Sequence, residues 1–368
     1  MFPEIITHID NQEYEKAKEL IDKLLLEGEE LLWKNYYYGL IAEKTNQLIE
    51  AENKYRQVIK DSIFPNPEIT KNIRDGLERI KQINLAQKDA ENKKREERKQ
   101  QTLAEFQENE NSNELAILVL KPLSPEEKNI VGKQFAEIIK VDPYTAKLQI
   151  PTRNLRLYQT GNYGELSYYQ QEFKSININS ICSSIKEVNQ TIVYQVKYIT
   201  QNQEQITVIY NDNKLSQEIE FTFNPQEIIN QVNGTVPIFE MTLHTNVKRK
   251  LTRKKETLDY INFCDLHLSK NKTILRFSDY IYQFDQGINT FKQDKTSRDK
   301  WLTLIRFLND KIGEVKSYNN FTPFAEGAIQ FPEMLKQVQS NINIFRKEET
   351  LWDEAFQLYS ALILLDNK

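Results

Sequence analysis

The chain contains few of the residues on which recognisable metal and redox sites depend. Its 368 residues include two cysteines and three histidines. The cysteines, Cys182 and Cys264, lie far apart in the sequence. So few cysteines are typical of a protein from a reducing compartment, although a single disulfide bridge between the two is the alternative. Cys264 and His267 do not make a structural zinc site, because such a site needs four ligands and the chain has no second recognisable pair. In an alternating strand these two side chains also face opposite sides, so we expect no metal site.

Glycine is scarce too, with ten in the whole chain, and the glycine-rich phosphate-binding motifs are absent. No serine lies in a Gly-x-Ser-x-Gly elbow, and no serine or cysteine has a histidine partner in a known catalytic signature. Adjacent acids such as Glu126 and Glu127 are expected on helix surfaces, whereas catalysis by paired acids needs a cleft. The sequence therefore predicts no catalytic residue, no cofactor and no enzymatic activity. An unrecognised enzyme is the third alternative.

Long apolar runs and a strong net charge are missing as well. No run approaches the ~18 apolar residues of a membrane-spanning helix, and the first residues lack the basic-then-apolar order of a secretion signal. The formal net charge of −4 argues against a protein that binds polyanions over its whole surface. We expect a cytoplasmic protein without a transmembrane segment, and peripheral contact with an anionic membrane is the alternative.

What the chain does have is a pattern that returns after 34 residues near its N-terminus. The first set of positions is Tyr14, Ala17, Ile21 and Leu24, and the second is Leu48, Ala51, Tyr55 and Val58. This period is typical of pairs of antiparallel helices in which small residues stand at close helix contacts and bulky ones fill the space beside them. Such hairpins stack through their apolar faces and leave a groove that holds part of another protein.

The N-terminal quarter, residues 1–85, resembles the tetratricopeptide repeat (TPR) family on these grounds. Gly39 stands at the family's tight helix-contact position, and Tyr55 at the large position of the second helix. Ala42 departs from the family, which usually has an aromatic residue there. The first unit is clipped and a third first-helix is expected from Pro67, so two units fall short of the three that a self-sufficient array needs. A generic helical hairpin is the alternative.

The resemblance implies that a partner protein binds in a groove lined by the first helix of each hairpin. The candidate partner-binding residues are Tyr36, Tyr37, Tyr38 and Asn46. Three consecutive helical residues point in three directions, so at least one tyrosine should be exposed, and exposed tyrosine favours binding surfaces. Core packing of part of this aromatic cluster is the alternative.

A change of composition marks residues 86–113 as a charged helical spacer. Residues 87–101 mix both charge signs, contain almost no apolar side chain and consist mainly of strong helix formers. Opposite charges three or four residues apart support a solvated helix. A coiled coil is less favoured, because a sustained apolar seam is missing.

The rest of the chain predicts an α+β multidomain protein. Residues 114–189 combine a buried strand with helices and indicate a small α/β module. From residue 190 the hydrophobic period becomes two, which predicts an antiparallel β-rich domain over 190–315 whose closing helix spans 297–312. Its architecture is similar to that of a pleckstrin-homology domain, although no motif supports the likeness. The last stretch, 316–368, is expected to be helical.

The whole chain is also similar to uncharacterised TPR proteins of cyanobacteria. The segments that carry this similarity are 135–147, 156–161 and 263–268. The similarity implies no particular activity.

A run of basic residues is the strongest charge feature of the chain. It comprises Lys248, Arg249, Lys250, Arg253, Lys254 and Lys255. In a hairpin these residues would present a cationic patch to acidic lipid or nucleic acid with salt-sensitive affinity, whereas a solvated turn that discourages edge aggregation is the simpler interpretation. The sequence thus favours a non-enzymatic adaptor or assembly factor that binds proteins through its TPR groove. An anionic-surface binder is the second alternative, and nucleic acid is the less expected partner.

Overall fold

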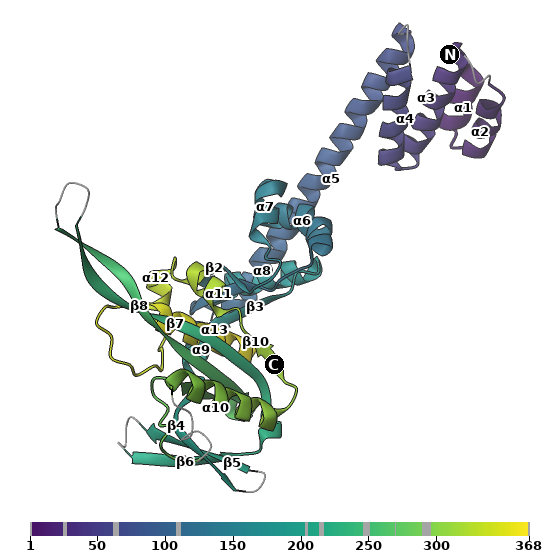
Figure 1. Ribbon diagram of the computed structural model, residues 1–368. Coiled ribbons are helices and arrows are strands. Elements are labelled where there is room, and N and C mark those ends of the chain that lie inside the picture. Colours follow the sequence, from purple (N-terminus) through teal and green to yellow (C-terminus); the bar gives the residue numbers. More distant parts are fainter. Residues whose placement is uncertain are drawn as a thin grey trace. The chain divides into compact units, whose positions relative to one another are not determined.

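In the computed structural model the chain divides into two compact units, Met1–Gln101 and Thr102–Lys368 (Figure 1). The structure describes residues 2–24, 28–61, 66–107, 112–202, 205–212, 217–245, 251–268, 270–288 and 296–366. These residues form 13 α-helices and two β-sheets. The mixed helix and strand content predicted from the sequence is therefore confirmed.

The first unit is helical. Its elements are α1 (Pro3–Asp10), α2 (Tyr14–Asp22), α3 (Gly28–Lys44), α4 (Leu48–Asp61) and most of α5 (Pro67–Gln107). The repeated small and large positions point inward, since Ala17, Ala51 and Tyr55 have no exposed surface. α5 is one continuous helix that extends through the charged segment, and the division between the units falls within it.

Tyr55 joins three helices of this unit. A Cβ on Gly39 of α3 would lie 2.8 Å from the Tyr55 ring, and a Cβ on Gly76 of α5 would lie 2.6 Å from it. Two glycines therefore make room for one buried aromatic ring. The Tyr55 hydroxyl donates to Glu43 Oε2 at 2.7 Å, and Arg79 of α5 donates to the same carboxylate through Nε at 2.6 Å. Tyr55 thus connects α3, α4 and α5.

The second unit contains both sheets. The small antiparallel sheet has the order β2 (Arg156–Asn162), β1 (Leu115–Leu120) and β3 (Ser180–Ser184). The large sheet has the order β10 (Lys316–Tyr318), β7 (Ile228–Thr245), β8 (Leu251–Leu268), β9 (Thr273–Ser278), β4 (Ile192–Asn202), β5 (Gln205–Asp212) and β6 (Gln217–Phe223). Its β10–β7 and β4–β9 pairs are parallel and its other pairs antiparallel.

Helices cover both sheets. They are α6 (Pro125–Ile139), α7 (Pro143–Gln149), α8 (Tyr163–Ser175), α9 (Ile185–Asn189), α10 (Ser297–Ile312), α11 (Phe321–Ala328), α12 (Pro332–Leu335) and α13 (Trp352–Leu365), with 3-10 turns η1 (Pro225–Glu227) and η2 (Lys270–Lys272). α6 begins with a capping box: the Ser124 hydroxyl accepts from the Glu127 backbone N–H, and the Glu127 carboxylate accepts from the Ser124 backbone N–H. Pro125 follows the cap. The closing helix predicted over 297–312 is confirmed as α10.

The last long helix forms the centre of the second unit. Ile117 and Val119 of β1 and Phe263 of β8 belong to the same core as Phe356 and Leu362 of α13. α13 therefore lies between the two sheets, and burial of nearly its whole surface explains why its apolar residues are not confined to one stripe. α10 covers the opposite face of the large sheet.

This arrangement differs from the expected division of the chain. The segments 114–189, 190–315 and 316–368, read from the sequence as separate parts, pack as one unit. Among the described strands the large sheet is open, with β10 and β6 at its edges. The likeness of residues 190–315 to a pleckstrin-homology domain stays a prediction.

Candidate functional site

The structure places the three candidate tyrosines mostly inside the first unit. Tyr36 is 6% exposed and Tyr37 has no exposed surface. The ring of Tyr37 stacks on Trp33, and its hydroxyl accepts from the backbone N–H of Phe2 at 2.9 Å. Burial raises the pKa of Tyr36 to about 12. These two side chains are not available to a partner, because Tyr36 stacks on Tyr55 of α4 with ring centres 5.9 Å apart and Tyr37 packs toward the first hairpin.

The remaining two candidate residues reach the surface at different places. Tyr38 is half-buried and its hydroxyl donates to Asp22 Oδ1 at 2.7 Å. Asn46 is exposed in the turn between α3 and α4, where its φ of 61° suits an asparagine. The structure therefore does not bring the four residues together on one binding face.

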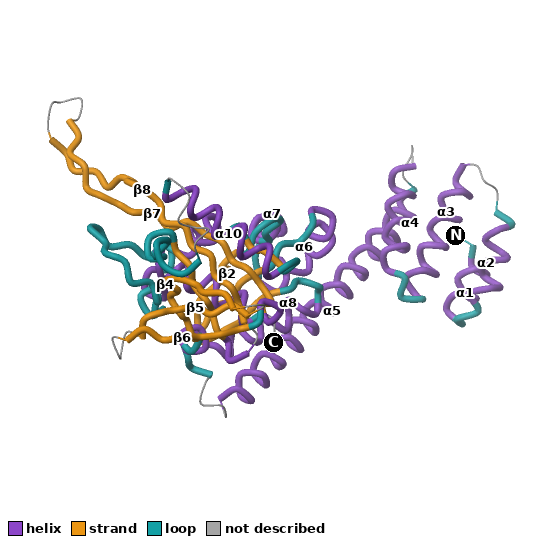
Figure 2. Tube along the Cα trace, turned by 60° about the horizontal axis from the view of Figure 1, so that its bottom comes forward, coloured by secondary structure: helices purple, strands orange, loops and turns teal. Residues whose placement is uncertain are grey.

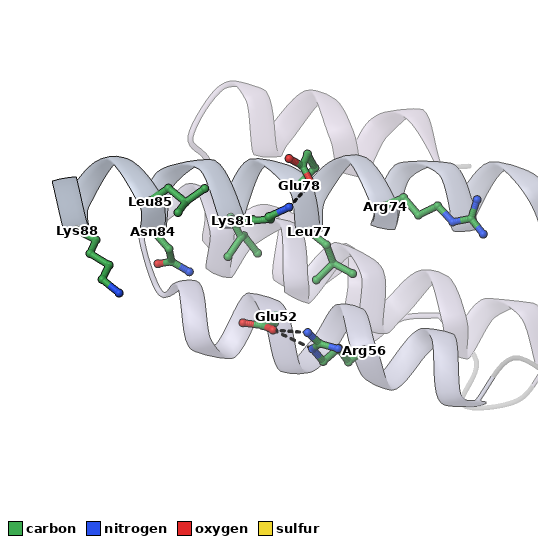
Figure 3. A pocket seen from close by; sticks show the side chains of 10 residues that line it. Glu52, Arg56, Arg74, Leu77, Glu78, Lys81, Asn84, Leu85 and Lys88 are labelled. Atoms are coloured by element: carbon green, nitrogen blue, oxygen red, sulfur yellow. Dashed lines mark hydrogen bonds and ion pairs between the residues drawn. The ribbon is translucent and has the colours of Figure 1, made fainter. Parts of the chain in front are cut away.

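A groove of about 610 Å³ lies instead between α4 and α5 (Figure 3). Its α5 wall is formed by residues that recur every three or four positions and so share one helical face: Arg74, Leu77, Lys81, Asn84 and Lys88. Glu52 and Arg56 line the α4 side. Leu77 points toward α4 in Figure 3, and Leu85 is 46% exposed. The groove thus combines an apolar floor with charged rims.

The charges along the groove are unbalanced. Four basic and two acidic residues line it. Arg56 Nη2 lies 2.7 Å from Glu52 Oε1, and Lys81 Nζ lies 3.7 Å from Glu78 Oε2. Both acids are thereby paired, whereas Arg74 and Lys88 form no ion pair with any described residue. Two positive charges are left at opposite ends of the groove.

A second hollow adjoins each end of this groove. One of about 230 Å³ shares Arg74 and includes Ile59, which is 49% exposed. The other, of about 590 Å³, shares Asn84 and includes Ile49, which is 81% exposed. From residue 67 to residue 88 the α5 helix extends about 32 Å at 1.5 Å per residue. The surface is long enough for a helix of four to six turns.

The described part of the basic run lies in the outer part of β8. Lys248, Arg249 and Lys250 fall outside the described residues. Arg253, Lys254 and Lys255 lie in β8 and are exposed.

A buried polar network connects α13 to the large sheet. Arg276 of β9 donates to both oxygens of Asp265 on β8, from Nε at 2.9 Å and from Nη2 at 2.7 Å. The Ser360 hydroxyl donates to Asp265 Oδ2 at 2.6 Å and lies 2.9 Å from His267 Nε2. A serine, a histidine and an aspartate thus meet. Because all three side chains are fully buried, a substrate has no access to Ser360 Oγ, and we interpret the network as structural.

Cys264 and His267 face opposite sides of β8, as the alternation of a strand predicted. Cys264 packs in the core below α10, and His267 reaches Ser360 on α13. Within the described ranges, no group of three or more His, Cys, Asp or Glu is placed to hold a metal ion. No helix in the described part of the chain has the length and apolar character needed to cross a membrane.

The buried His267 gives unit 2 a predicted acid sensitivity. Burial lowers its pKa to about 4, against an ordinary value of 6.5. The unfolded chain therefore takes up a proton at this histidine as the pH falls below 6.5, while the folded chain does not. The free energy of unfolding consequently decreases between about pH 6.5 and pH 4. We expect this residue to contribute a loss of about 2.5 kcal/mol between pH 7.5 and 4.5. Chemical denaturation at both pH values measures the free energy of unfolding. Its decrease from pH 7.5 to pH 4.5 should be smaller for His267→Gln than for the wild type. An equal decrease in the two proteins contradicts the idea that His267 causes the acid sensitivity.

In comparisons with known proteins, no family model, curated protein or solved structure matches the chain. The TPR resemblance therefore stays a prediction that depends on the residues quoted for it.

Sequence reasoning missed the residues that line the groove. One signal could have found them: they recur every three or four residues and so share one face of a helix. They are Arg74, Leu77, Lys81, Asn84 and Lys88, which lie in the helix expected from Pro67 and at the start of the charged spacer.

Proposed function

We propose that the protein is a non-enzymatic adaptor that binds an acidic amphipathic helix of a partner protein in the groove between α4 and α5. The observation that carries the proposal is the pair of uncompensated cations, Arg74 and Lys88, on the rims of a groove with exposed apolar side chains. Helix-in-groove recognition uses an apolar stripe for affinity and flanking charges for orientation. An acidic helix meets both demands.

The order of the helices supports a helix as occupant. α3 is followed by a turn and by α4, which packs against it. α5 does not turn back but continues as one helix to Gln107. No described helix of the first unit therefore takes the position that a second helix would occupy beside α5. A partner helix lying there would complete a third hairpin and cover Leu77 and Leu85.

The proposal predicts a preference for acidic over basic helices. Two synthetic peptides of about 18 residues would share leucines at helical spacing and differ only in flanking glutamates or lysines. We expect the full-length protein to bind the acidic peptide about tenfold more tightly at low salt, because two exposed charge pairs contribute up to about 1 kcal/mol each. Fluorescence anisotropy with a labelled peptide measures the two affinities.

Charge reversal tests whether the groove is the site. Arg74→Glu with Lys88→Glu should remove or invert the preference. Lys60→Glu with Lys71→Glu is the matched control, because both lysines are exposed on the same two helices but do not line the groove. Equal binding of the two peptides by the wild type, or equal effects of the two double variants, contradicts the proposal.

A further inference from the structure

On one face of the outer part of the β7–β8 hairpin, apolar side chains lie beside basic ones. Leu243 pairs with Arg253, Met241 with Lys255, and Thr245 with Leu251. Residues opposite each other in an antiparallel pair share a face, as do residues two apart in one strand. Met241, Leu243, Leu251, Arg253 and Lys255 therefore form one surface, named here the apolar–basic face.

The apolar members of this face are strongly exposed. Met241 is 41%, Leu243 66% and Leu251 71% exposed. The hairpin extends beyond the other strands of its unit in both views (Figures 1 and 2), so the other described strands do not pair with its outer end. Exposed apolar side chains gathered on a projecting element mark an interaction surface.

The basic members keep their charge. Lys255 donates from Nζ to the backbone carbonyl of Glu349 at 2.6 Å and lies 4.7 Å from the centre of the Phe239 ring. Both partners are neutral groups. Arg253 has no ion pair with any described residue.

The opposite face of the hairpin has a different character. Glu256 lies there between His244, whose Nε2 is 2.9 Å from Glu256 Oε1, and Lys254, whose Nζ is 3.8 Å from the same oxygen. Thr242 also donates to Glu256. An acid thus offsets the cations on this side, whereas on the apolar–basic face the described cations lie beside exposed apolar side chains without an acid partner.

We propose that the apolar–basic face binds the surface of an anionic membrane. In this arrangement Leu243, Leu251 and Met241 enter the headgroup region, while Arg253 and Lys255 contact lipid phosphates and carboxylates. Interfacial elements obtain affinity from buried apolar area together with attraction to anionic lipid. Nucleic acid fits less well, because single strands are held by aromatic stacking and the exposed apolar residues of this face are aliphatic. The proposal does not depend on the groove in the first unit.

Vesicle sedimentation with the full-length protein tests the proposal. At low salt the protein should bind vesicles of phosphatidylcholine containing about 30% phosphatidylserine and should not bind pure phosphatidylcholine, because the attraction depends on anionic lipid. Leu243→Ser with Leu251→Ser should reduce the binding about tenfold, since both side chains lose apolar area. Leu302→Ser is the control: this leucine lies on α10 and is 42% exposed. It should leave the binding unchanged.

Charge reversal on each face of the hairpin distinguishes binding by the apolar–basic face from a general attraction between basic residues and anionic lipid. Arg253→Glu should lower the affinity for anionic vesicles at least threefold more than Lys254→Glu, the neighbouring lysine on the opposite face. Circular dichroism of each variant checks that the fold is retained. Absence of wild-type binding at low salt, or equal effects of the two reversals, overturns the proposal. Tight binding of a single-stranded oligonucleotide that the leucine variants retain, with vesicle binding unaffected by those variants, overturns it in favour of nucleic acid.

Discussion

Replacement of Arg276 by methionine is expected to destabilise the second unit by about 3–5 kcal/mol, because it leaves the buried Asp265 carboxylate without its counter-charge. Neither side chain has exposed surface. The Arg276 guanidinium also donates to the Ser340 carbonyl at 2.9 Å and lies 4.9 Å from the centre of the Phe356 ring. One side chain therefore holds β8, β9, α13 and the loop before α13 together.

A double variant distinguishes loss of the pair from loss of packing. Arg276→Met with Asp265→Leu removes both charges, and we expect it to recover most of the stability lost in the single variant, since a buried pair replaced by apolar residues is often neutral. Urea denaturation followed by fluorescence measures all three proteins; Trp301 and Trp352 lie in this unit. A single variant as stable as the wild type contradicts the structural role of the network.

Tyr55→Ala is expected to destabilise the first unit by about 3–5 kcal/mol, the cost typical of deleting a large buried aromatic side chain. The ring fills the space between Gly39 and Gly76 and so connects α3, α4 and α5. Hydrogen–deuterium exchange on the full-length protein measures the effect in this unit, because α4 and the first part of α5 should lose protection while β1 and α13 keep theirs.

Two further variants test the physical cause. Tyr55→Phe keeps the ring and removes the bond to Glu43, so we expect a smaller loss of about 1 kcal/mol. Gly76→Ala places a methyl group against the ring and should destabilise the contact between α4 and α5. Wild-type protection in Tyr55→Ala contradicts the idea that this ring joins the three helices.

Local patterns in the sequence predicted several elements closely. The helix over 297–312 follows from its apolar stripe, and the inward positions of Ala17, Ala51 and Tyr55 follow from the 34-residue period. Both depend on residues near each other in the chain or on a repeat. The alternation of β8 likewise placed Cys264 and His267 on opposite faces.

Features that depend on long-range packing were not predictable in the same way. α13 packs between two sheets whose strands lie far away in the sequence, so its apolar surface alone did not show what it contacts. Tyr37 is buried by the hairpin that precedes α3, which no property of α3 itself indicates. The groove depends on α5 continuing straight beside α4, and a sequence that predicts a helix does not say which of its faces stays open.

The most direct test of the proposed function is hydrogen–deuterium exchange of the full-length protein with and without the acidic helical peptide. An occupied groove predicts slower exchange in α4 and over residues 67–88 of α5, with no change in the rest of α5 or in the second unit. The same measurement on Arg74→Glu with Lys88→Glu should show no protection by this peptide. Protection confined to other elements, or protection that this double variant retains, contradicts the groove as the binding site.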